Sequence, residues 1–99
     1  MKMIKLSEKL LKYMVTEYKK HETDSFSFDE FQELYPDETE KSISKALYHL
    51  QEHDLVSILT GGDIPFRTNL LTSGIAYCEN NTLLKKGYQT AKEIKSWIP

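Results

Sequence analysis

A helix followed at once by a β-hairpin, over residues 36–72, constrains this chain more than any other stretch. Pro36 ends the preceding element, because proline has no amide hydrogen and disfavours helix in the residue before it. Two caps are possible for the next helix: Asp37 in a capping box with Glu40, or Thr39 one turn in. Apolar residues then recur at three- and four-residue steps, so this helix is predicted to bury one face: Ile43, Ala46, Leu47 and Leu50.

The hairpin follows directly from the end of this helix. Asp54 lies where a left-handed residue is needed, a conformation that Asp tolerates better than most residues. Residues 55–60 are rich in apolar and β-branched residues, and Gly61-Gly62-Asp63 interrupts them. Residues 66–71 then return as the partner strand, which gives a predicted connection of about five residues.

The flanking segments add further elements. Apolar residues within residues 3–20 recur at helical spacing, so this segment is predicted to be the first helix. Residues 25–27 are predicted to form a short strand, and residues 28–35 a second helix. Ser27 with Glu30 is predicted to cap that second helix. Its inward residues are Phe28, Phe31 and Leu34.

Two more helices are predicted after the hairpin. One covers residues 73–80 and the other residues 83–98, separated by a break at Asn80-Asn81-Thr82. Trp97, near the end of the last helix, is expected to pack on the first helix. The prediction is therefore an α+β, winged helix-turn-helix fold with about five helices, a small antiparallel hairpin as the wing and a C-terminal helical extension. Residues 1–99 form a single domain on this prediction.

Composition limits the setting of the protein. The chain has 99 residues, a net charge of −2 and one cysteine, Cys78, so it holds no internal disulfide. No apolar run reaches the length of a membrane span, and the lysines and glutamate of the first residues argue against a signal peptide. We therefore expect a cytoplasmic protein with no membrane contact.

The C-terminal third resembles a known family. The segments concerned are residues 71–80 (LTSGIAYCEN), 83–88 (LLKKGY) and 92–99 (KEIKSWIP). They resemble the YjcQ-like family of small winged-helix proteins from bacteria and their phages. The resemblance implies a winged-helix fold and a phage or prophage setting, and it implies no activity.

A winged domain that reads DNA lays its third helix in the major groove and sets the wing on the backbone. The residues that fit these roles are Lys41, Ser44, Lys45, Tyr48 and His49 on the helix and Arg67 in the wing. Lysine and arginine would contact phosphate, whereas Ser44 and Tyr48 would reach base edges. The leading hypothesis is a DNA-binding or regulatory module that binds double-stranded DNA and has no catalytic activity or cofactor.

The charge distribution opposes this hypothesis and supports an alternative. Between Glu17 and Asp54 the chain carries eleven acidic residues and four lysines. Acidic side chains therefore lie beside the predicted reading surface, and phosphate contacts supply much of the affinity for DNA. The alternative is a winged-helix protein–protein interaction module. Its partner would be a basic protein, bound through Glu30, Glu33 and Glu38, or a second copy bound through the last helix.

Catalytic and metal sites have weak sequence support. His49 and His53 have the i, i+4 spacing of a helical metal pair, but no further ligand is evident, so we expect no metal site. Cys78 has no histidine or basic neighbour in the sequence to activate it, and we expect a small core residue there. The sequence therefore predicts that the protein is not an enzyme.

Overall fold

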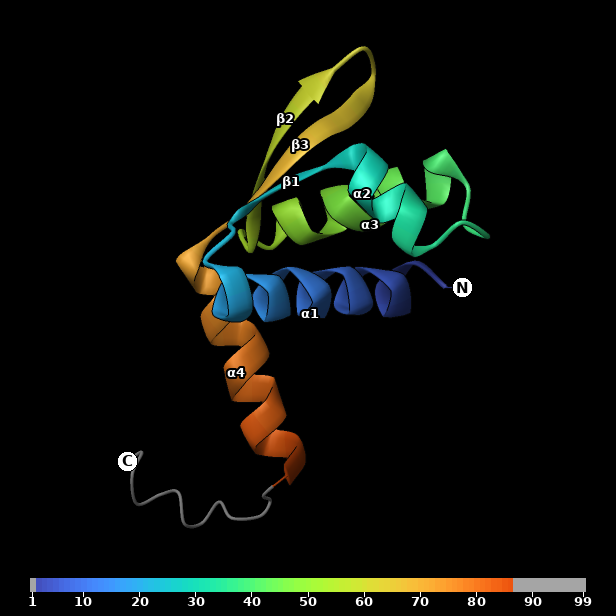
Figure 1. The fold of residues 1–99 in the computed structure, drawn as a ribbon. Helices are drawn as coiled ribbons and strands as arrows, with labels where there is room; N and C mark the ends of the chain where they lie inside the picture. The colour runs from blue at the N-terminus through green and yellow to red at the C-terminus, as the bar shows by residue number, and fades with distance from the viewer. Residues whose placement is uncertain (1, 87–99) are drawn as a thin grey trace.

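The structure is a computed structural model that describes the backbone of residues 2–86 and the side chains of residues 2–80. Within this part of the chain, four helices and a three-stranded antiparallel sheet make an α+β fold (Figure 1). The elements are α1 (Met3–His21), β1 (Ser25–Ser27), α2 (Phe28–Leu34), α3 (Glu40–Glu52), β2 (Val56–Gly61), β3 (Ile64–Leu70) and α4 (Thr72–Lys86).

The elements stack in layers (Figure 1). The sheet has the order β1-β3-β2 and packs on α3, and α3 in turn packs on α1. Strand β3 is central, with Phe26 and Ile58 on either side of Thr68. Helix α4 leaves the end of β3 and contacts α1.

The core lies between α1, α3 and the inner face of the sheet. The predicted apolar face of α3 is confirmed, because all four of its members are buried. Three aromatic rings, those of Tyr13, Phe26 and Phe31, meet with centroids 6.0–6.2 Å apart. Thr68 is fully buried beside them, and its hydroxyl has no hydrogen-bond partner among the described residues.

Both ends of α3 are closed by local hydrogen bonds. Of the two possible caps, Thr39 is the one used: its hydroxyl accepts from the Ser42 amide at 3.0 Å. At the other end, the Asp54 amide donates to Gln51 and the Leu55 amide to Leu50, the pattern of a Schellman motif. Asp54 has φ 61°, so the predicted left-handed position is confirmed.

The hairpin is tighter than the sequence suggested. Gly61 pairs with Ile64, so the connection is two residues and not about five. Gly62 and Asp63 have φ of 59° and 68°, as the turns that suit a two-residue hairpin require. Pro65 fits inside β3 because the pairing with β2 shifts register between Leu59 and Gly61, opposite residues 65–66, and proline is tolerated at such an irregularity.

Helix α2 follows the sequence prediction at its start and departs from it at its end. Ser27 and Glu30 form the predicted capping box. Phe28 and Phe31 are buried, but Leu34, predicted to face inward, is 39% exposed. The helix ends at Leu34, two residues before the turn that begins at Pro36, and this last side chain is outside the core cluster.

The prediction of about five helices is wrong for the described residues. Helix α4 runs unbroken from Thr72 to Lys86 and passes through Asn80-Asn81-Thr82. Asn and Thr are only mildly unfavourable in a helix, and this segment contains no proline to remove a hydrogen bond. The rest of the predicted helix 83–98, with Trp97, lies outside the described residues beyond Lys86.

The start of α4 is joined closely to the end of α3. The Leu71 amide donates to the Leu55 carbonyl at 3.2 Å, and the Ser73 hydroxyl donates to the Asp54 carbonyl. Gly74 is buried at this junction, where a Cβ would lie 2.4 Å from the Leu55 carbonyl oxygen. Only glycine fits there without a shift of the backbone. In the part of the chain that the structure covers, none of the helices is both long and apolar enough to cross a bilayer.

Candidate binding surfaces

The outer side of α3 presents two of the predicted DNA-contact residues together. Lys41 and Lys45 are exposed and lie one helical turn apart, and Ser44 beside them is half-buried. Tyr48 is also half-buried, and its hydroxyl lies 3.1 Å from the Thr60 hydroxyl of β2. This ridge therefore joins the outer side of α3 to the hairpin.

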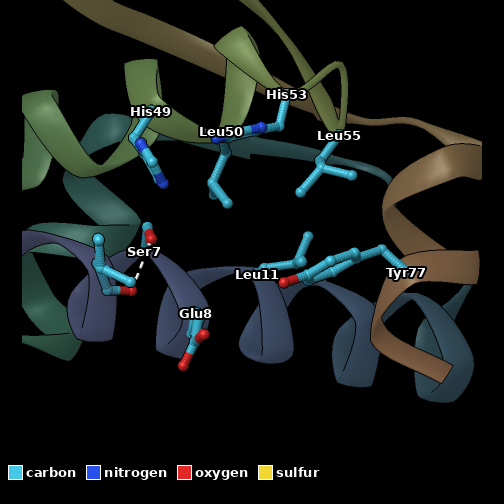
Figure 2. A pocket seen from close by; sticks show the side chains of 9 residues that line it. Ser7, Glu8, Leu11, His49, Leu50, His53, Leu55 and Tyr77 are labelled. Atoms are coloured by element: carbon cyan, nitrogen blue, oxygen red, sulfur yellow. Dashed lines mark hydrogen bonds between the residues drawn. The ribbon is translucent and has the colours of Figure 1, made fainter. Parts of the chain in front are cut away.

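His49 lies on a different side of α3, toward α1. Its ring packs edge-on against His53, with centroids 4.7 Å apart. Both rings line a groove of about 340 Å³ between α1, α3 and α4 (Figure 2), whose remaining walls are Ile4, Ser7, Glu8, Leu11, Leu50, Leu55 and Tyr77. His49 is therefore separate from the lysine ridge.

Arg67 also lies away from α3. Its guanidinium donates to the Ser25 hydroxyl at 3.0 Å across the β1–β3 pair. Because side chains alternate along a strand, Arg67 lies on the opposite face of the sheet from the buried Thr68, and α3 packs on the inner face. The structure therefore places the predicted DNA-contact residues in three separate places.

The hairpin presents apolar side chains and one acid. Leu59 and Phe66 are 59% and 53% exposed. Asp63 lies in the turn and is exposed. Phosphate contact depends on cations, so this end of the hairpin suits an apolar partner better than a nucleic-acid backbone.

The predicted protein-contact acids have different environments. Glu30 is part of the core edge: its carboxylate accepts from the Tyr13 hydroxyl at 2.8 Å and belongs to the capping box. Burial, and then the bond to Glu30, raises the pKa of Tyr13 to about 12. Glu33 is exposed and Glu38 is half-buried. Of the three, Glu33 is the one available to a partner without cost to the fold.

Several acidic residues lie near Glu33 in the chain, on α2 and in the segment that leads into α3. We call this stretch the acidic face and define it as exposed Asp29, Glu33, Leu34, Asp37 and Glu40 together with half-buried Glu38. Leu34 follows Glu33 directly in the chain, and 39% of its surface is exposed. The sequence signal for this face was the run of acids, but the exposure of Leu34 could not be seen in it.

Metal and nucleophile chemistry gain no support from the described side chains. Residues 2–80 contain no group of three or more His, Cys, Asp or Glu side chains placed to hold a metal ion. Glu8 points away from the histidine pair (Figure 2). Cys78 is half-buried and packs against the core, as predicted.

Comparisons of the chain with known protein families, with curated proteins and with solved structures each found no match. The resemblance to the YjcQ-like family therefore stays a prediction.

Proposed function

We propose that the chain is a regulatory module of the winged-helix type that works by binding another macromolecule, with a basic protein as its first candidate partner. The winged-helix assignment is supported by the order of elements: α1, β1, α2, α3 and then the β2–β3 hairpin, with β1 at the edge of the hairpin sheet. In this assignment α2 and α3 are the helix-turn-helix unit and the hairpin is the wing.

The observation that carries the choice of partner is Leu34 on the acidic face. A leucine with 39% of its surface exposed, between Glu33 and Asp37 in the chain, is suited to a partner surface that combines basic and apolar side chains. Burial of the leucine side chain would contribute to the binding free energy, and the charged residues would contribute orientation and association rate. The hairpin turn carries Asp63 and no cation, which also favours a protein partner over DNA.

The test is affinity purification of the tagged 99-residue chain from lysate of its natural host, compared with two charge-matched variants. Glu33→Lys with Leu34→Ser changes the acidic face, and Asp63→Lys with Leu59→Ser makes the same changes on the hairpin. We expect a basic protein to be retained by the wild type and the hairpin variant and lost with the first variant. Identical capture by all three chains would refute the proposal.

DNA binding by α3 is the second candidate. The observation in its favour is the ridge on the outer side of α3, where Lys41 and Lys45 are exposed beside half-buried Ser44 and Tyr48. Two lysines supply few phosphate contacts, so this mode depends on base contacts and selects a sequence. Selection from a random duplex library should then enrich one site, and Lys45→Glu should abolish the enrichment. A library that stays random after selection rules this mode out.

A further inference from the structure

A row of lysines lies along one side of α1. We define the lysine row as Lys2, Lys5, Lys9, Lys12, Lys19 and Lys20, all of which are exposed. The first four follow at steps of three and four residues, the spacing that keeps side chains on one side of a helix. Exposed Thr16 fills the next step of the same side.

This side of the helix points away from the core. Leu6, Leu10 and Met14 are buried on the opposite side, where α1 packs on α3. From Lys2 to Lys20 the row is about 27 Å long, at 1.5 Å per residue. Helix α4 meets it at one end only, where Lys19 forms an ion pair with Glu79 at 2.9 Å. The other five lysines extend along a side that no other described element covers (Figure 1).

The charge of the molecule is divided between two regions. Residues 2–20 carry six lysines and two glutamates, whereas residues 21–80 carry twelve acidic and three basic side chains. Glu8 adjoins the row, three residues after Lys5 and four before Lys12, and Glu17 lies 3.9 Å from His21. A polyanion is therefore attracted to one side of the protein and repelled by the rest.

We propose that the lysine row binds the phosphate backbone of double-stranded DNA without reading its sequence. DNA carries one negative charge per about 1.7 Å of helix axis with both strands counted, so a duplex segment as long as the row carries roughly sixteen, of which those on the near side face the lysines. Its side chains are lysines and one threonine, all of which contact phosphate, and the row holds no arginine, asparagine or glutamine for base recognition. This inference is independent of the proposed function and uses a different side of the molecule from α3.

Two other occupants fit the row less well. A helix that inserts into a lipid surface needs a free apolar side, and that side of α1 is buried in the core. The acidic face of a second copy would offer only exposed ion pairs, each of which contributes little. A polyanion of high charge density matches the row best.

The experiment measures fluorescence anisotropy of a labelled 20-base-pair duplex titrated with the full chain at several salt concentrations. With five phosphate contacts, the slope of log K against log salt is expected to be about −4.5. Affinity should then fall about 500-fold between 50 mM and 200 mM salt. Duplexes of unrelated sequence should give the same values.

Two double variants locate the surface, because each removes two exposed lysines four residues apart on one helix. Lys5→Gln with Lys9→Gln should reduce the slope by about 1.8 and weaken binding about a hundredfold at 50 mM salt. Lys41→Gln with Lys45→Gln should leave both values close to those of the wild type. Lys and Gln have similar helix propensities, so both variants should fold, which circular dichroism checks.

The proposal is overturned if the duplex does not bind at 50 mM salt, or if both variants weaken binding equally, which indicates only net charge. It is also overturned if the α3 variant alone loses affinity. The remaining alternative is that the row binds a membrane surface. Co-sedimentation of the chain with vesicles that contain anionic lipid, at the same salt concentration, measures this binding. Tighter binding to vesicles than to the duplex would assign the row to a membrane surface instead.

Discussion

Replacing Gly74 with alanine tests how α4 is joined to the rest of the fold. The added Cβ would lie 2.4 Å from the Leu55 carbonyl oxygen and 3.0 Å from Leu70 Cδ1. That oxygen accepts the hydrogen bond from the Leu71 amide, and the Leu55 amide closes the end of α3. The clash therefore involves backbone that is held from both sides, and it is not relieved by a change of side-chain rotamer.

The change in the free energy of unfolding caused by Gly74→Ala is the sum of two unfavourable contributions and one favourable contribution. Overpacking costs about 1–3 kcal/mol, and weakening the Leu71–Leu55 hydrogen bond adds about 1 kcal/mol. The higher helix propensity of alanine stabilises the variant by about 1 kcal/mol. We expect a net loss of about 2 kcal/mol, which lowers Tm by roughly 8–16 °C in a domain of this size.

Urea denaturation followed by circular dichroism measures this loss, and Ala76→Gly provides the matched control. Ala76 is exposed in the same helix, so this reverse exchange measures the propensity term alone, about 1 kcal/mol of destabilisation. If Gly74→Ala is as stable as the wild type or more stable, the close approach of α4 to Leu55 does not exist.

Three further substitutions test local features. Thr68→Val should raise the free energy of unfolding by about 1 kcal/mol in urea titrations, because it removes a buried hydroxyl without a partner among the described residues; a loss would mean that the hydroxyl is bonded. Asp54→Gly should add up to about 1 kcal/mol in the same assay, since φ is 61° there, and a destabilised variant would argue against that backbone conformation. The pKa of Tyr13 is about 12 in the folded state, against the ordinary tyrosine value of 10.0, so wild-type stability should be complete below pH 10 and should fall as pH rises from 10 toward 12. Tyr13→Phe should lack this alkaline loss relative to the wild type, and identical pH profiles would refute the raised pKa of Tyr13.

Periodicity and capping chemistry predicted the elements whose signals are local. The buried face of α3, the Ser27–Glu30 box and the left-handed Asp54 all depend on residues within one or two turns of each other. The length of the hairpin connection was predicted less well. It depends on how far the pairing extends toward the turn, and Gly61 still pairs there.

Features set by packing between distant segments could not be predicted in this way. Asn80-Asn81-Thr82 has the composition of a break, yet α4 continues through it. Arg67 was assigned to the same surface as Lys45, but the register with Ser25 places it on the other face of the sheet. Strand pairing decides that orientation, and one sequence does not specify it.

A titration of the isotope-labelled chain with duplex DNA at low salt, followed by NMR of the backbone amides and the lysine Cε groups, distinguishes the surfaces of opposite charge in one experiment. We predict that the signals that shift belong to α1 and its lysine row, and that those of α2, α3 and the hairpin stay in place. Shifts confined to α3 and the hairpin, or no shifts at all, would contradict the division of charge as the basis for how this protein meets its partners.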